Sequence, residues 1–228
     1  MRGHIGIVAC AAGGEARCYR LLHANGTEPV GARARPEISM HVHSTSEYAK
    51  FIAAGDWPRV ADLMLYSASK LAKIGIDFLI CPADTLHCAL PRVEPRSPLP
   101  WLHMADAIAA EALRRSFLRL GLIGRHCLVE SATYQGKLLA HGLKLVRPNA
   151  AAQDEIDRVI VDELAHGVLK LDTIIYLQRV MERMKAESCD AAVLGCSEVS
   201  LLMDDSNSPL PTLDSTTVLA RAALHRAG

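Results

Sequence analysis

Short apolar runs alternate with longer amphipathic stretches along most of the chain, and this alternation constrains the fold more than any other feature. Short apolar runs suit strands that are buried on both faces, and apolar residues three or four apart suit covering helices. The expected strands span residues 5–9, 38–42, 78–81, 120–123, 143–146 and 192–194. The expected helices span residues 46–54, 59–74, 103–116, 131–141, 153–166, 173–186 and 215–226. This order predicts an α/β protein with mostly parallel sheets.

Local signals divide the chain into two lobes. Four prolines between Pro91 and Pro100 predict a rigid, extended crossing, and the last helix is expected to return to the first lobe. We therefore expect one lobe of residues 1–98 with 214–228 and a second of residues 99–213.

Asp56 and Asp214 precede two of the helices as start signals. The segment from Gly13 to Glu15 lacks the spacing of a phosphate loop, so a tight turn is expected there.

Composition narrows the class of protein. Lys and Arg (25) balance Asp and Glu (25) among the 228 residues, which argues against nucleic acid or an anionic membrane as a partner. The N-terminus shows no apolar signal core, and no apolar run approaches the roughly 20 residues of a membrane span. The seven cysteines show neither CxxC pairs nor zinc-ligand spacing. We expect reduced thiols, no metal site and a cytoplasmic location.

Cys196 has the most reactive sequence context in the chain. It follows the apolar run 191–195 and is followed by Ser197 and Glu198. This order places a thiol at the carboxyl end of a strand, where open α/β sheets bind their ligands. The start of a following helix is expected to lower the pKa of this thiol. Cysteines elsewhere are expected to be small buried apolar residues, namely Cys10, Cys18, Cys88, Cys127 and Cys189.

A similar arrangement follows the expected strand at 78–81. Asp84, Thr85 and His87 place a carboxyl, a hydroxyl and an imidazole within four residues. Thr85 suits the N-cap of the next helix, and nearby backbone N–H groups suit a substrate carboxylate, so both roles can coexist. His41 and His43 alternate on a strand and share a face, so one of them can reach a substrate or both can be ordinary structural histidines.

These segments resemble a known family. Residues 195–198, Gly-Cys-Ser-Glu, resemble the Gly-Cys-Thr-Glu motif of the aspartate/glutamate racemase superfamily, and residues 82–87, Pro-Ala-Asp-Thr-Leu-His, resemble its Pro-Cys-Asn-Thr-x-His motif. Segments 36–41, 93–100 and 211–216 resemble a bacterial racemase-like subgroup. The resemblance implies two pseudo-symmetric parallel-sheet α/β lobes with the active site in the cleft between them. It also implies a cofactor-independent isomerase, without PLP, that moves an α-proton with cysteine, and often a homodimer.

The departures from the family pattern leave three accounts open. Ala83 stands where the family has its first catalytic cysteine, and Arg125 stands where it usually has threonine. In the first account Asp84 is the second base, Arg125 offsets its charge, and the protein is an amino-acid racemase or epimerase. In the second, Cys196 alone serves a decarboxylase or isomerase of a small carboxylic acid. In the third, the protein is a catalytically impaired binder of a small acid.

Two further readings of position 83 stay open, because Cys81 could replace the missing thiol, and an engineered substitution at Ala83 would leave the same sequence. We favour the racemase, with Cys196 and Asp84 as catalytic residues. The substrate, an amino acid or other small carboxylic acid, is expected to contact Thr85, Ala83, His87, Arg125, Ser197, Glu198 and His43.

Overall fold

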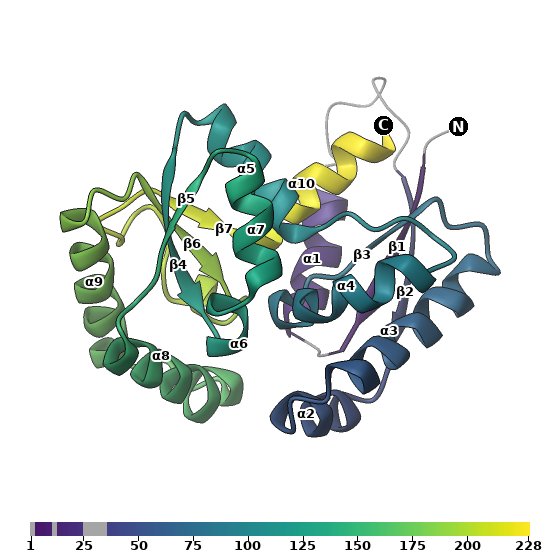
Figure 1. Cartoon of the computed structure of the whole chain (residues 1–228), viewed down its shortest axis with the longest axis horizontal. Helices are drawn as coiled ribbons and strands as arrows, with labels where there is room; N and C mark the ends of the chain where they lie inside the picture. The colour runs from purple at the N-terminus through teal and green to yellow at the C-terminus, as the bar shows by residue number, and fades with distance from the viewer. Residues whose placement is uncertain (1–2, 11–12, 25–35) are drawn as a thin grey trace. The chain divides into compact units, whose positions relative to one another are not determined.

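Figure 1 shows a computed structural model of the chain, which describes residues 3–10, 13–24 and 36–228. The chain divides into two compact units, which we call unit 1 (residues 1–104 with 216–228) and unit 2 (residues 105–215). Each unit contains a parallel sheet with helices around it. The predicted α/β class with parallel sheets is therefore confirmed.

Unit 1 is built on a three-stranded sheet in the order β2-β1-β3. Its strands are β1 (His4–Ala9), β2 (Glu37–Val42) and β3 (Phe78–Ile80), and all three are parallel. Its helices are α1 (Gly13–Ala24), α2 (Thr45–Ala53), α3 (Trp57–Ala72), the 3₁₀ helix η1 (Asp84–Ala89), α4 (Leu90–Val93), η2 (Glu94–Arg96) and α10 (Ser215–Ala227). The central strand β1 is buried along its whole length, as expected for a parallel strand between two neighbours.

Unit 2 contains a four-stranded parallel sheet in the order β5-β4-β6-β7. Its strands are β4 (Arg119–Gly124), β5 (Lys144–Val146), β6 (Ala191–Gly195) and β7 (Thr212–Asp214). Its helical segments are α5 (Met104–Arg114), α6 (His126–Val129), α7 (Ala132–Ala140), α8 (Ala150–Asp162), η3 (Leu164–His166), α9 (Leu171–Ala186) and η4 (Val199–Leu201). Strand β6 is buried throughout, so the residue that follows it emerges directly from the core.

Each sheet packs against its own helices. In unit 1, α3 contributes Val60, Met64 and Leu71 to a core shared with Leu79. In unit 2, α8 and α9 contribute Ile156 and Met181 to a core with Leu194. The Asp56 side chain accepts a hydrogen bond from the Arg59 N–H and so caps α3, as its place before the helix predicts.

Two local predictions in unit 1 are wrong. Gly13, Gly14 and Glu15 form the first turn of α1 rather than a tight turn, and α1 has no counterpart among the predicted helices. The proline-rich segment is largely helical, as α4 and η2, rather than extended. Pro91 and Pro95 occupy the first turns of these short helices, where a backbone N–H has no partner to lose.

Two predictions in unit 2 also differ from the structure. The expected helix 153–166 begins earlier, because Asn149 accepts a hydrogen bond from the Ala152 N–H, and its last turn is the separate η3. Strand β7 was not among the expected strands. It contributes only three residues after a proline-bearing segment, which is too short for a period-two pattern to stand out.

Candidate functional site

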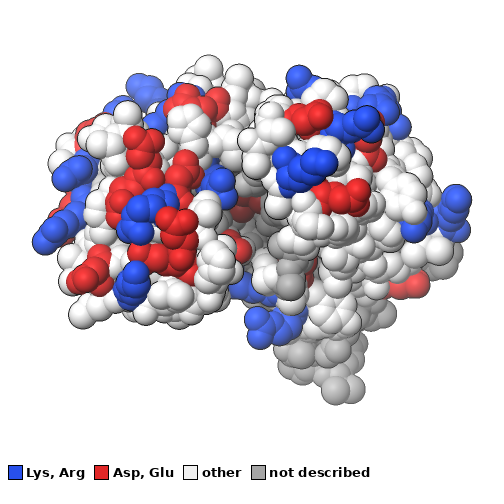
Figure 2. Space-filling model, turned by 90° about the horizontal axis from the view of Figure 1, so that it is seen from below, with Lys and Arg blue, Asp and Glu red and all other residues white. Residues whose placement is uncertain are grey.

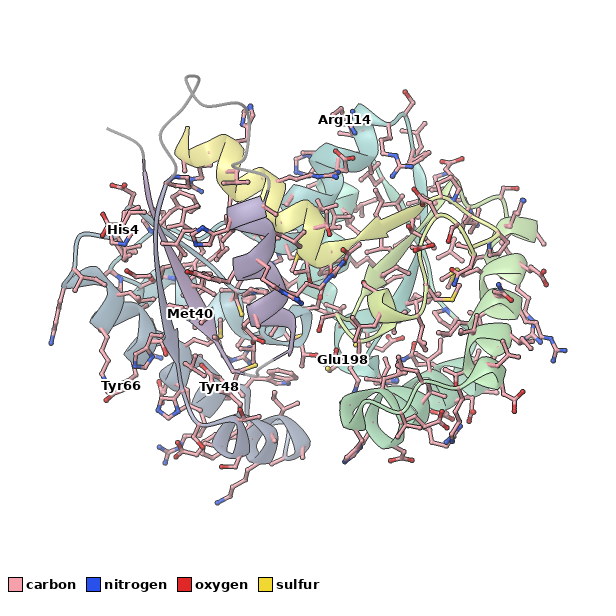
Figure 3. The ribbon with its side chains drawn as sticks, turned by 180° about the vertical axis from the view of Figure 1, so that it is seen from behind. His4, Met40, Tyr48, Tyr66, Arg114 and Glu198 are labelled. Atoms are coloured by element: carbon pink, nitrogen blue, oxygen red, sulfur yellow. The ribbon has the colours of Figure 1, made fainter. Side chains whose placement is uncertain are left out.

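The Cys196 thiol lies immediately after β6 and is hydrogen-bonded to an acidic side chain. Its S–H donates a hydrogen bond of 3.0 Å to Glu198 Oε2, and the Ser197 hydroxyl donates one of 2.9 Å to the same oxygen. Cys196 is only 8% exposed. The strand end therefore presents a thiol, a hydroxyl and a carboxylate in one hydrogen-bonded group, whose Glu198 is marked in Figure 3.

The pKa of the Cys196 thiol is raised, which corrects the expectation that it would be lowered. Burial is the largest cause, and the Glu198 carboxylate adds to it through its charge and hydrogen bond. The backbone N–H groups of Glu198 and Val199 act in the opposite direction but are outweighed. The helix that follows, η4, has only three residues, so it supplies too few aligned peptide groups to stabilise a thiolate. At neutral pH Cys196 is a protonated group that can donate.

Glycines let the ends of β4 and β6 approach closely. A Cβ on Gly124 would lie 2.8 Å from the backbone oxygen of Gly195, so a side chain would force the two strands apart. Gly124 and Gly195 are the last register partners of β4 and β6, and Arg125 and Cys196 are the residues that follow them on the two strands. The Nε atom of Arg125 lies 3.2 Å from Asp157 Oδ1, within the same unit.

The corresponding strand end in unit 1 carries Ala83, Asp84 and Thr85. Ala83 is half-buried, and Asp84 and Thr85 are the first two residues of η1. Asp84 is buried. The N-cap position of η1 falls on Ala83 rather than on Thr85, and no side-chain cap bond is present. The N-cap alternative for Thr85 is therefore wrong, and its hydroxyl remains a candidate for substrate.

His87 is anchored on both sides of its ring. Its Nε2 lies 2.9 Å from the carbonyl oxygen of Cys81, and its Nδ1 lies 3.3 Å from the Met104 amide nitrogen. The carbonyl requires an N–H at Nε2, and the amide requires a lone pair at Nδ1, so both bonds together define one neutral tautomer. The ring also packs edge-on against His103 with the centroids 4.7 Å apart. These contacts fix the His87 ring between the carbonyl of Cys81 and the amide of Met104, both of which belong to unit 1.

His43 lies just beyond β2, in an aromatic cluster. Its Nδ1 accepts a hydrogen bond of 2.8 Å from the Ser44 N–H and lies 3.3 Å from Glu47. Its ring packs edge-on against Tyr48 and Tyr66, with centroids 6.1 and 5.5 Å away. Figure 3 marks both tyrosines. The Nδ1 atom of His43 is therefore already hydrogen-bonded to the backbone N–H of Ser44.

Sequence reasoning considered Cys81 alone and did not group it with Cys10, Glu15 and Tyr48, which lie near it in unit 1. The Cys10 N–H donates a hydrogen bond of 3.0 Å to Glu15 Oε1. Cys81 is completely buried, and its pKa is raised by burial first and then by Cys10 and Glu15. A signal existed in the sequence, because Cys10 follows a buried strand directly, as Cys196 does.

On the face drawn in Figure 2, acidic and basic side chains lie next to one another. Acidic and basic side chains are interspersed over the α8 region in Figure 2, where Arg158 pairs with Glu155 and Glu163, and Lys170 also pairs with Glu163. Among the residues with described positions, no three His, Cys, Asp or Glu side chains are grouped to hold a metal ion. No helix in the described ranges combines the length and the apolar character that a membrane crossing requires.

Comparison with known proteins relates both strand ends to one family. The family model described as Asp/Glu/Hydantoin racemase matches residues 17–223. The chain belongs to this family. It therefore falls among racemases, isomerases that act on amino acids and related compounds.

Individual relatives are distant in sequence but close in fold. The broad specificity amino-acid racemase RacX of Bacillus subtilis is 21% identical over 172 residues, which cover 74% of this chain and 73% of RacX. A Yersinia pestis structure assigned to the Asp/Glu racemases is 25% identical, with a TM-score of 0.90 and 99% of both chains covered. An aspartate racemase homologue from Pyrococcus horikoshii is 24% identical, with a TM-score of 0.83 and coverage of 100% and 99%. The family fold is thus present throughout the chain.

Proposed function

We propose that the protein is a cofactor-independent amino-acid racemase or epimerase in which Cys196 carries the α-proton on one face of the substrate. The observation that carries the proposal is the hydrogen bond from the Cys196 thiol to Glu198 at the end of β6, in a chain of the racemase family. The raised pKa keeps this sulfur protonated at rest, so it suits the step in which a proton is delivered to a carbanion.

Proton transfer at Cys196 involves no other reactant. In the protonation step the S–H bond breaks, its proton forms the new C–H bond with the electron pair of the α-carbon, and the sulfur is left as a thiolate. In the reverse direction this thiolate removes the α-proton. The backbone N–H groups of Glu198 and Val199, which face the sulfur, offset the charge that appears there.

Several side chains from the sequence analysis are proposed to bind the substrate. Hydroxyls of Thr85 and Ser197, with the backbone near Ala83, are suited to the α-carboxylate, and Arg125 is suited to a further acidic group. Glu198 and His43 are proposed to contact polar groups of the substrate as well. His87 is better assigned to holding the turn after β3, because both of its ring nitrogens are engaged.

The mechanism also needs a second proton carrier, on the face of the α-carbon opposite Cys196. A racemase needs a carrier for each face of the α-carbon, and Ala83 cannot be one. The sequence hypothesis assigns this role to Asp84, which stands directly after it. Of the two positions where the family motifs have cysteine, only position 196 carries one in this chain. This also supports a second candidate function, a decarboxylase or isomerase in which Cys196 protonates one face only.

Deuterium exchange distinguishes these functions. Proton NMR in D₂O should show loss of the α-proton signal from a susceptible amino acid, tested with aspartate, glutamate and a wider panel. Cys196→Ala should slow the exchange by about 10²–10⁴-fold, the usual contribution of a general acid–base group. The matched control is Cys189→Ala, which removes another buried thiol of unit 2. Polarimetry then separates racemisation from exchange on one face.

Absence of exchange across the panel would contradict the racemase. Release of carbon dioxide from a malonate-type acid would then support the decarboxylase.

We also propose that the protein is cytoplasmic and homodimeric. The described cysteines form no disulfide, which supports a reducing compartment, and the consecutive exposed side chains Val168 and Leu169 offer apolar surface to a second copy. Light scattering of the purified protein tests the dimer.

A further inference from the structure

Helix α8 holds the turn that follows β4 at two points within unit 2. Gln153 and Asp157 are four residues apart, so their side chains lie on one face of the helix. Gln153 Nε2 donates a hydrogen bond of 2.9 Å to the carbonyl oxygen of Gly124, the last residue of β4. Asp157 accepts from the His126 N–H, at 2.9 Å to Oδ1 and 3.3 Å to Oδ2. Arg125 therefore lies between two anchored backbone groups.

The Arg125 side chain is held at one edge and open at the other. Its Nε atom is buried and lies 3.2 Å from Asp157 Oδ1, as an ion pair rather than an aligned hydrogen bond. The side chain as a whole is 38% exposed. Within the described part of the chain its two Nη atoms have no hydrogen-bond partner. The edge formed by these atoms, which suits a carboxylate through two parallel hydrogen bonds, is therefore left for another molecule.

Other arginines of unit 2 use their guanidinium within the protein. Arg114 donates from Nε and Nη2 to both carboxylate oxygens of Glu111, on the same helix. Arg158 donates in the same way to Glu155. These are ordinary ion pairs of an exposed helix surface, and each side chain holds the other. Arg125 differs, because its partner is itself fixed by a backbone N–H and its terminal nitrogens stay open.

Gln153 is an independent sign that the position of this turn matters. It is 4% exposed, and its Oε1 has no hydrogen-bond partner among the described residues. A carbonyl oxygen only accepts, so the amide nitrogen must face Gly124 and the amide oxygen must face away from it. A buried oxygen without a partner is destabilising, and an apolar side chain of similar length would avoid this loss. Such a side chain could not hold the Gly124 carbonyl.

We propose that Asp157 is a positioning residue for Arg125, and that Arg125 held in this way selects substrates with a second anionic group. The proposal rests on the substrate site of the proposed function. Arg125 and Cys196 follow the last register pair of β4 and β6, so the cation and the thiol belong to the same edge of one sheet. The class of substrate is an amino acid whose side chain ends in a carboxylate, in preference to the matching amide.

Asp157 has two opposing effects on an anion that approaches Arg125. Its charge repels the anion, and its ion pair orders the cation. Both side chains are partly exposed, so water and salt weaken the repulsion. An ordered guanidinium loses less conformational freedom when it binds a carboxylate than a free one does. The ordering effect is therefore the larger one, and Asp157 favours binding.

The test compares an acidic amino acid with its amide, because aspartate and asparagine have nearly the same size. The quantity measured is the ratio of their kcat/KM values for α-proton exchange. Arg125→Gln should lower this ratio by about 10–100-fold, the effect of losing hydrogen bonds to a charged group. Asp157→Leu should lower it by about 3–10-fold through the KM of aspartate, with kcat within about twofold. Asp157→Asn keeps an oxygen facing Arg125 and should lie closer to the original protein.

A double substitution shows whether Asp157 acts through Arg125. In the Arg125→Gln background, Asp157→Leu should change the ratio no further. Asp154→Leu is the matched control, because it makes the same change at an exposed position of α8 and should leave the ratio unaltered. A ratio that does not respond to Arg125→Gln would overturn the selection by Arg125. Independent effects of the two substitutions would overturn the positioning role of Asp157.

Calorimetric titration separates this proposal from the racemase proposal. Binding of aspartate and asparagine measures selection without turnover. Preference for aspartate that depends on Arg125, in a protein that exchanges no α-proton, would support the roles of Arg125 and Asp157 while the racemase proposal fails. Exchange whose acid-to-amide ratio ignores Arg125 would overturn these roles and leave the racemase. Binding of neither compound, with no exchange, would overturn both.

Discussion

The Cys196 thiol and the Glu198 carboxylate are joined by a hydrogen bond of 3.0 Å in which sulfur is the donor. This bond holds the proton on the sulfur and places a negative charge beside it. Both effects raise the pKa of Cys196, in addition to burial. The arrangement favours a resting thiol over a permanently activated thiolate, and it makes the protonation state of Cys196 sensitive to Glu198.

Glu198→Gln should therefore lower the pKa of Cys196. The amide keeps a hydrogen-bond acceptor but removes the charge that disfavours the thiolate. Thiolate absorbance near 240 nm, recorded against pH and corrected with Cys196→Ala, measures the change. A pKa that stays the same or rises would show that burial alone sets the state of this thiol.

His87→Ala should destabilise unit 1. The change removes a buried ring that bonds the Cys81 carbonyl and the Met104 N–H, so it leaves both groups unpartnered and opens a cavity. Losses of this kind lower the free energy of unfolding by about 2–4 kcal/mol. Urea denaturation measures the loss. A variant of normal stability with a raised KM would instead assign His87 to substrate binding.

Gly124→Ala should disturb the strand end that carries Cys196. Its Cβ would meet the Gly195 carbonyl oxygen at 2.8 Å, and backbone cannot move aside as a side chain can. Overpacking of this kind costs about 1–3 kcal/mol, and we expect α-proton exchange to fall with it. Gly136→Ala is the matched control, because its site in α7 has nothing within 4 Å. That variant should be neutral or more stable by up to about 1 kcal/mol.

Acid should weaken the segment between α8 and α9 through Glu163. Hydrogen bonds from Thr173, Lys170 and Arg158 lower the pKa of Glu163 to about 2. Its unfolded value is about 4.3, so its contribution to stability is complete above that pH and disappears as pH falls toward 2. Urea midpoints measured between pH 5 and 2 should fall less steeply in Glu163→Gln. Identical pH slopes in the two proteins would contradict this linkage.

The sequence predicts the fold well where periodicity is strong. Strands such as β1 and β6 are apolar throughout, and α3 has both an apolar stripe and the Asp56 cap. The prediction of secondary structure failed where one residue type is compatible with two local structures. Proline at Pro91 suits an extended segment and also the first turn of a helix, and only packing against α3 decides between them.

The candidate site was predicted in part. Cys196 with Ser197 and Glu198 is visible as a run of adjacent residues, and the structure joins these side chains by hydrogen bonds. The pKa of the thiol was not predictable, because burial depends on the packed structure. The group around Cys10 was missed because Tyr48 and Cys81 are distant from it in sequence and meet only through the sheet and α2.

The register between β1 and β3 has a consequence for how such proteins are classified. Residues 10 and 83 follow the adjacent parallel strands β1 and β3 at their carboxyl ends, so both belong to the same edge of this sheet. A search that requires cysteine at the second position would discard this chain as inactive. Inspecting the residues that follow both strands together would show that this chain carries a cysteine, Cys10, at the same edge.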